Sequence, residues 1–312
     1  MQQHVLVPLD GSAMAEAIIP QVIPLARAYG SAVTLLKVIA PPLIMGPLGG
    51  PVAIPEELPE ELEREAHDYL ARVARRLAAQ GVPVRIKVLY GNPALSITGY
   101  VEKVPGVRLL AMAAHSHGDM HHLIFNDVVA QVGSMIPIPV LLFFPRKGAT
   151  ITPRPVTYRK ILVPLDRSAS SELALSEAEQ IASSVGATIV LASVAPASAR
   201  DDLRPAEEPA RVGGGPTRVA TPSRSGIERC TAYLEAKASE LRAQGIAVQT
   251  EAASGQPVEE LLRIIGQQQP DLLVMAAHRR SEVQRLFRGS VAAKVMRGTG
   301  LPGLLVQARE DG

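Results

Sequence analysis

Apolar and polar residues alternate along this chain with two periods, one typical of β-strands and one typical of α-helices. Apolar runs with the length of buried strands lie at residues 5–9 (VLVPL), 32–39 (AVTLLKVI) and 84–90 (VRIKVLY). Amphipathic stretches with helical spacing lie between them, at residues 13–29 and 60–80. Strands that alternate with helices in this way predict a parallel sheet covered by helices.

The second half of the sequence repeats the first. HVLVPLDGS at residues 4–12 returns as KILVPLDRS at 160–168, an offset of 156 that later becomes 164 and then 163. A repeat of roughly 150 residues is long enough for a complete domain with its own core. We therefore predict two tandem Rossmann-like, doubly wound α/β domains, residues 1–148 and 149–312. Each is expected to hold a five-stranded parallel sheet of order 3-2-1-4-5 with helices on both faces.

The copies differ most after their second strand, where the second copy carries an insertion at about residues 197–226. This segment is poor in large apolar side chains and cannot bury enough surface to order itself, so we expect a mobile loop there. Between the copies, residues 145–158 are rich in proline, threonine and basic side chains, as linkers are.

Composition and charge narrow the classes of function. The formal net charge is only +2, which argues against a nucleic-acid-binding module. No window of about 20 uncharged apolar residues could span a bilayer, and the N-terminus lacks the pattern of a signal peptide. The single cysteine, Cys230, excludes internal disulfides and is interpreted as a packing residue of a helix. We expect a cytoplasmic protein that binds neither nucleic acid nor membrane.

Open parallel sheets bind ligands beyond the carboxyl ends of their strands, where the strand order reverses. This rule draws attention to the ends of the first and fourth strands of each copy. Asp10 and Asp166 follow the first strands. Each carboxylate either caps the next helix or reaches the ribose hydroxyl of a nucleotide, and the sequence leaves both interpretations open.

The segments after the fourth strands are MAAHSHGDMHHLIFNDVVAQV at 112–132 and MAAHRRSEVQRLFRGSVAAKV at 275–295. Together with the V-P-L-D openings and the G-x-P turns at 91–93 and 255–257, they resemble the universal stress protein family. Domains of that family wrap a G-x2-G-x9-G-[ST] loop around the phosphates of ATP. The resemblance covers most of both copies and implies the fold predicted above.

The family loop is only partly kept. In the second copy its glycine positions and the hydroxyl position after them fall on Ala276, Arg279, Gly289 and Ser290. In the first copy they fall on Ala113, Ser116, Asn126 and Asp127. Glycine lets backbone N–H groups approach phosphate oxygens closely. Of the six glycine positions in the two copies, only residue 289 still holds glycine.

The two losses have different consequences. In the second copy, Gly289 and Ser290 lie where a helix should begin, a favourable place for an anion. Four arginines lie close to that turn in sequence, at positions 279, 280, 285 and 288. Their positive charge could attract phosphates, or they could form a solvated basic surface. In the first copy, a carboxylate at Asp127 would cost on the order of 4 kcal/mol beside a phosphate at an effective dielectric near 20. The first copy is therefore predicted not to bind ATP in the family's usual manner.

The resemblance thus implies a stress-response regulatory protein that binds ATP, or a related adenine nucleotide, mainly in its second domain, with Mg²⁺ shielding the phosphates. The residues expected to hold the nucleotide are Pro164, Leu165, Asp166, Ser193, Val194, Met275, Ala276, His278, Arg279, Arg280, Gly289, Ser290 and Val291. The sequence contains no P-loop, kinase or nucleophile-elbow motif, so no catalytic residue is assigned. At most, slow ATP hydrolysis or autophosphorylation would accompany binding.

Two alternatives stay open. Family members that lose the glycine loop are thought to work without ATP, which would make this chain a nucleotide-free interaction or scaffold protein. A weaker alternative is a metal site in the first copy, because imidazoles close in sequence can ligate zinc, nickel or copper. Its candidate ligands are His115, His117, His121 and His122. The same histidines could instead hold an anion, sense pH or lie in a polar surface loop.

The last strand of each copy is apolar and would be prone to aggregation if its edge were bare. In dimers of the family the corresponding strands meet across a two-fold axis. We therefore predict that residues Pro139 to Phe144 pair with Gly303 to Gln307, so that one chain forms an internal pseudo-dimer. The resemblance also implies a further homodimer and a protein partner that the sequence does not identify.

Overall fold

The computed structural model describes residues 3–40, 57–114, 128–129, 131–133, 135–145, 156–196, 224–277 and 291–307. The elements of the first half are β1 (His4–Pro8), α1 (Ala13–Glu16), α2 (Ile19–Ala28), β2 (Ala32–Ile39), α3 (Glu57–Ala78), β3 (Val84–Tyr90), α4 (Pro93–Lys103), β4 (Val107–Ala113) and β5 (Val140–Phe143). Those of the second half are β6 (Lys160–Pro164), α6 (Ala169–Val185), β7 (Thr188–Ala195), α7 (Arg224–Ala243), β8 (Val248–Ser254), α8 (Pro257–Gln268), β9 (Leu272–Ala277), α10 (Val291–Thr299) and β10 (Gly303–Gln307).

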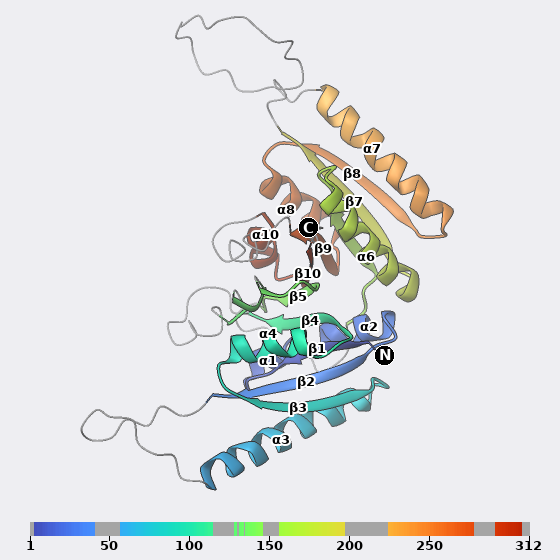
Figure 1. Cartoon of the computed structure of the whole chain (residues 1–312). Helices are drawn as coiled ribbons and strands as arrows, with labels where there is room; N and C mark the ends of the chain where they lie inside the picture. Colours follow the sequence, from blue (N-terminus) through green and yellow to red (C-terminus); the bar gives the residue numbers. More distant parts are fainter. Residues whose placement is uncertain are drawn as a thin grey trace, which may run out of the picture.

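The strands form one ten-stranded sheet of order β3-β2-β1-β4-β5-β10-β9-β6-β7-β8 (Figure 1). Neighbouring strands are parallel except at the centre, where β5 and β10 are antiparallel. There, Leu142 lies opposite Gly303 and Val140 opposite Leu305. The strand order 3-2-1-4-5 of each half and the pairing of the two last strands are therefore confirmed.

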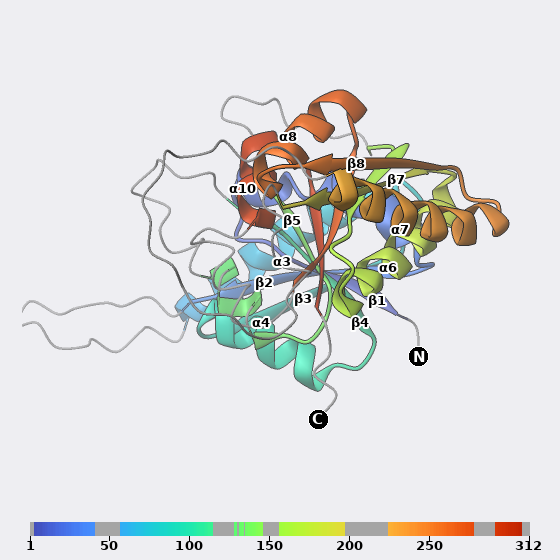
Figure 2. The same ribbon diagram turned by 90° about the horizontal axis from the view of Figure 1, so that it is seen from above.

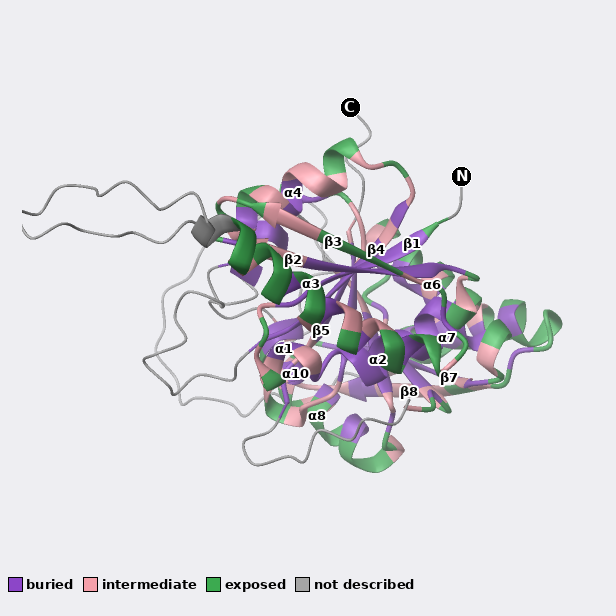
Figure 3. Cartoon of the chain, turned by 90° about the horizontal axis from the view of Figure 1, so that it is seen from below, coloured by how far each residue is buried: buried purple, intermediate pink, exposed green. Residues whose placement is uncertain are grey.

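Two layers of helices cover the sheet, one on each face, because successive strand residues point to opposite sides. In β1, Val5 and Val7 belong to the core beneath α2, α3, α6 and α7, whereas Leu6 belongs to the core beneath α4, α8 and α10. Figure 2 shows α8 and α10 on one side of the second half and α6 and α7 on the other. Buried residues follow the central strands, and the exposed ones lie on the outer faces of the helices (Figure 3).

The pattern of residues 13–29 predicts one helix, but the chain forms two, α1 and α2. Pro20 stands in the first turn of α2 and has no N–H to give to the carbonyl of residue 16, so the first helix ends there. Pro24, inside α2, likewise leaves the carbonyl of Pro20 without its helical donor. The backbone N–H of Val156 donates to that carbonyl at 3.3 Å, which ties the second half to α2.

Side chains also join the halves. The hydroxyl of Tyr158, which is fully buried, donates to the backbone oxygen of Gln21 at 3.0 Å. On α6, the carboxylate of Glu177 accepts two hydrogen bonds from Nη2 of Arg108, at 2.6 and 2.8 Å, and one from the hydroxyl of Tyr29 at 3.1 Å. The Arg108 guanidinium also stands 4.9 Å from the centre of the Tyr29 ring. These contacts fix the two halves against each other, as predicted for a pseudo-dimer.

Some expectations fall on parts of the chain that the structure does not describe. The predicted domain boundary at 148/149 lies in the undescribed range 146–155. The predicted insertion at 197–226 lies outside the described residues as far as residue 223. Its last three residues, 224–226, begin α7 instead. None of the described helices is both long enough and apolar enough to cross a membrane.

Candidate functional site

The turn after β6 holds the first predicted site residue, Asp166. Its Oδ1 accepts hydrogen bonds from the backbone N–H and the hydroxyl of Ser168, at 3.0 and 2.5 Å. Ser168 in turn accepts from the N–H of Ser171 at 3.2 Å and so caps α6. Ser168 is therefore the cap of α6, and Asp166 holds Ser168 in place. Of the two interpretations that the sequence left open for Asp166, the one in which it caps the helix itself is wrong.

The first domain repeats this arrangement. Oδ1 of Asp10 accepts from the N–H of Ser12 at 2.8 Å and from its hydroxyl at 2.7 Å. Ser12 then accepts from the N–H of Ala15 at 3.0 Å and caps α1. The turn therefore belongs to the shared fold, and the side chain of Asp166 is exposed at the carboxyl edge of the sheet.

The strands around this turn bring the other described candidates to the same edge. β6 pairs with β7 on one side and with β9 on the other, all parallel, so the three carboxyl ends share one edge. Crossovers leave in opposite directions from β6 and β9, which makes this the switch point of the second half. Val194 and Met275 are half-buried on the same face of the sheet, and Ala276 lies on the other.

Ser193 has a different role from the one that its position suggests. Its side chain is buried, and its hydroxyl lies 3.5 Å from Sγ of Cys230 on α7. That side chain therefore serves the packing of α7, and only the backbone of Ser193 remains for a ligand. Leu165 is also buried, and its N–H donates to the carbonyl of Ala192 at 2.7 Å, whereas Pro164 is half-buried at the end of β6.

Much of the predicted phosphate loop lies outside the described residues. This holds for His278, Arg279, Arg280, Gly289 and Ser290, and for the four histidines proposed as metal ligands, His115, His117, His121 and His122. α10 begins at Val291, directly after the loop. The described part of the site is thus the edge formed by the turn after β6, the ends of β7 and β9, and the start of α10.

One residue beside this edge was not predicted from the sequence. Arg167 adopts a left-handed backbone conformation, with φ of 68°, where the first copy has Gly11 with φ of 100°. The turn requires this conformation in both domains, and in the second it places an arginine next to Asp166. The aligned repeat shows the Gly11 to Arg167 exchange, which is the signal that could have found it.

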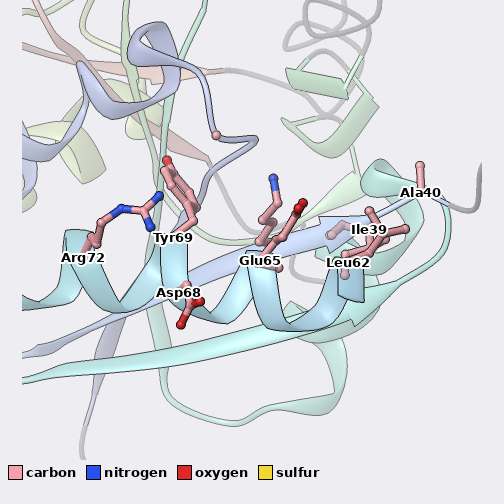
Figure 4. A pocket seen from close by; sticks show the side chains of 11 residues that line it. Ile39, Ala40, Leu62, Glu65, Asp68, Tyr69 and Arg72 are labelled. Atoms are coloured by element: carbon pink, nitrogen blue, oxygen red, sulfur yellow. The ribbon is translucent and has the colours of Figure 1, made fainter. Parts of the chain in front are cut away.

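Sequence reasoning also missed a cavity in the first domain. It has a volume of about 650 Å³ and lies between the end of β2 and the helix α3 (Figure 4). Its polar lining includes Lys37, Glu65, Tyr69 and Arg72. The exchange of Lys37 for Ser193 between the copies was visible in the sequence, but the space around Lys37 depends on how α3 packs.

Comparisons with known proteins agree with the fold. The Universal stress protein family matches the chain twice, over residues 1–143 and 157–307. A universal stress protein from Archaeoglobus fulgidus has a similar structure, with a TM-score of 0.71 and 18% identity over 99% of this chain and 97% of its own. A putative universal stress protein from Pseudomonas aeruginosa has a TM-score of 0.57 and 15% identity, over 98% and 93%.

A third solved structure is a universal stress protein in complex with cAMP, similar at 23% identity over 49% of this chain and 98% of its own, with a TM-score of 0.36. No curated protein matches the sequence. The two family matches cover most of both halves, and the structural likeness extends over the whole chain. The chain therefore belongs to the universal stress protein family, as two tandem domains.

Proposed function

We propose that the protein is a stress-response regulator whose second domain binds ATP or a related adenine nucleotide, without a dedicated catalytic reaction. The observation that supports this most is the position of Asp166 at the switch point of the second half, beside the ends of β7 and β9. Ligands of open parallel sheets bind at such points. The fixed turn around Ser168 holds Asp166 at that edge.

The nucleotide would lie along this edge. In our proposal, Asp166 binds the ribose, the backbone near Val194 faces the base, and Met275 provides an apolar contact. The phosphates and Mg²⁺ would meet the loop that leads into α10, where Gly289 and Ser290 precede the helix start. Arg167, which the turn places next to Asp166, adds positive charge to this region.

The first domain is a poorer candidate for the same ligand. It has Asp127 where the second has Ser290, and Lys37 where the second has Ser193. The ammonium of Lys37 donates to the backbone oxygen of Asp10 at 2.7 Å, so this lysine lies beside the turn that would face the ribose. We infer one nucleotide per chain.

Mass spectrometry of the small molecules released from the purified protein by heat, with their stoichiometry, tests the proposal. One adenine nucleotide per chain is expected. Two per chain would contradict the role given to Asp127. If nothing is released and MgATP does not bind in calorimetry, the nucleotide-free scaffold function replaces this one.

A further inference from the structure

The cavity between β2 and α3 in the first domain is lined by both apolar and polar residues. Its apolar lining comprises Val38, Ile39, Ala40, Leu62 and Ala66. In Figure 4, Tyr69 and Arg72 lie towards one end and Leu62 and Ile39 towards the other, with Glu65 between them, while Asp68 points away. Glu65, Asp68 and Arg72 are exposed. At about 650 Å³, the cavity falls within the range of about 300–1,000 Å³ that is usual for ligand sites.

Lys37 is the charged group inside this cavity. It is half-buried, donates one hydrogen bond to the backbone oxygen of Asp10 and stands 5.4 Å from the centre of the Tyr69 ring. An ammonium has three N–H donors. Among the residues that the structure describes, no carboxylate lies within ion-pair distance of Lys37. Burial lowers the pKa of Lys37, although the charges of Asp10 and Glu65 act in the opposite direction.

A partly desolvated cation of this kind favours an anionic ligand, because a charge taken out of water is costly unless it is paired. The sequence between β2 and α3 carries one acidic residue, Glu56, which directly precedes α3. Residues 41–55 contain no aspartate or glutamate. A small anionic ligand from outside the chain would pair with this cation.

The second domain shows which residues create this space. At the positions of Lys37, Leu62 and Ala66 it has Ser193, Gly226 and Cys230. There, the Ser193 hydroxyl lies 3.5 Å from Sγ of Cys230. A Cβ added at Gly226 would lie only 3.2 Å from Cβ of Ala195. α7 thus packs directly on β7, whereas the larger side chains of Lys37 and Leu62 stand between α3 and β2.

Gly11 completes the site. Its φ of 100° is left-handed, and a Cβ at this position would lie 3.3 Å from Nζ of Lys37. The glycine therefore leaves room for the ammonium beside the turn after β1. The second domain has Arg167 here and no lysine on β7 to accommodate. Three exchanges, at Gly11, Lys37 and Leu62, thus distinguish this space from its counterpart in the second domain.

We propose that the first domain binds a small monocarboxylic acid with an apolar body, whose carboxylate pairs with Lys37 and whose apolar part lies against Ile39, Leu62 and Ala66. A single interior cation suits a single negative charge. The exposed carboxylate of Glu65 at the rim disfavours a polyanion such as a triphosphate. This site is separate from the nucleotide site proposed in the second domain.

Calorimetric titration of the full chain with octanoate tests this inference, with octan-1-ol and octylammonium as neutral and cationic isosteres. One octanoate per chain is expected to bind, and each isostere at least about tenfold more weakly, as for loss of one charged hydrogen bond. Lys37→Met should raise the Kd of octanoate by roughly 10- to 100-fold. Lys87→Met is the matched control, because Lys87 is exposed on the adjacent strand β3 and does not line the cavity.

A second variant keeps the charge and removes the space. Ala66 is fully buried in the wall, and Ala66→Leu should abolish octanoate binding while Lys37 remains. Absence of octanoate binding to the wild type would overturn the inference. So would unchanged binding in Lys37→Met or Ala66→Leu, or equal binding of octylammonium. Ser290→Asp changes the proposed nucleotide site and should leave octanoate binding unaltered. Loss of octanoate binding in this variant would place octanoate in the second domain and overturn the inference.

Discussion

The side chain of Met296 on α10 occupies the space that any side chain at Gly303 on β10 would need. A Cβ built at Gly303 would lie 2.8 Å from Cγ of Met296 and closer still to Sδ. In the first domain the repeat places Gly133 at the helix position and Val140 at the strand position. The two domains fill equivalent space from opposite sides, the first from the strand and the second from the helix.

This relationship predicts strong coupling between the two positions. Gly303→Val should lower the free energy of unfolding by about 1–3 kcal/mol or more through overpacking. Met296→Ala should lower it by about 2–5 kcal/mol through the cavity that it leaves. The double variant should lose clearly less than the sum, because the valine enters the space left by the methionine. Urea unfolding of all four proteins measures the coupling, and additive losses would contradict the relationship.

Stability should depend on the pH through His4. Its ring is buried, both ring nitrogens lack a hydrogen-bond partner among the described residues, and Tyr100 packs edge-on at 6.3 Å. Burial, with a smaller effect of Arg85, lowers the pKa of His4 below its ordinary value of 6.5. On acidification the unfolded chain therefore takes up this proton first. Stability should fall as the pH drops below 6.5 and continue to fall until the pKa of the folded state has been passed.

The variant His4→Phe keeps an apolar ring at this position and removes the titration. Urea unfolding at a series of pH values should show a smaller loss on acidification for His4→Phe than for the wild type. An identical pH dependence in the two proteins would show that His4 does not contribute to it.

The ion pair between Arg108 and Glu177, which joins the domains, should contribute more to the free energy of unfolding than an exposed ion pair does. Arg108 and Glu177 are only 22% and 14% exposed, and Tyr29 also donates to the carboxylate. Glu177→Gln should lower the free energy of unfolding by about 1.5–3 kcal/mol, because the arginine is left without its charged acceptor. The same change at Glu260, which pairs with Arg263 at 24% and 45% exposure, should cost about 0–1 kcal/mol. Equal losses in thermal unfolding would contradict a special role for the pair between the domains.

Nucleotide binding should be lost when Ser290 of the second domain is replaced by aspartate, the residue that the first domain has at this position, Asp127. Ser290→Asp is expected to weaken MgATP binding by roughly a thousandfold, from the repulsion between a carboxylate and a phosphate at about 4 Å. Titration calorimetry of the full chain measures this. Ser12→Ala is a control for stability, because it removes the α1 cap in the first domain and no predicted nucleotide contact. An unchanged affinity in Ser290→Asp would show that the phosphates lie elsewhere.

The sequence predicted the order of strands and the central pairing because both depend on features that a linear pattern carries. Strand runs, the repeat and the family resemblance were sufficient for β1 to β10. The sequence left open whether Asp166 caps α6, and the structure shows that Ser168 provides the cap. An Asx turn and a cap have the same sequence signature at this spacing, so the pattern alone could not separate them.

Other features depend on distances between elements, which the pattern does not contain. The cavity at Lys37 lies between β2 and α3, and the repeat alone does not show how a helix packs on a sheet. The exclusion between Met296 and Gly303 is likewise a property of packing. Pro20 was visible in the sequence as a helix-breaking residue, but the strong apolar period of residues 13–29 outweighed it in the prediction.

The antiparallel contact between β5 and β10 also changes how the protein can vary. In a dimer of identical subunits, every substitution appears on both sides of the two-fold axis. Here the axis lies inside one polypeptide, so a replacement such as Lys37 or Asp127 alters one domain and leaves its counterpart, Ser193 or Ser290, untouched. The covalent link thus breaks the symmetry of the assembly while it keeps the shared interface, and each half is free to acquire a ligand of its own.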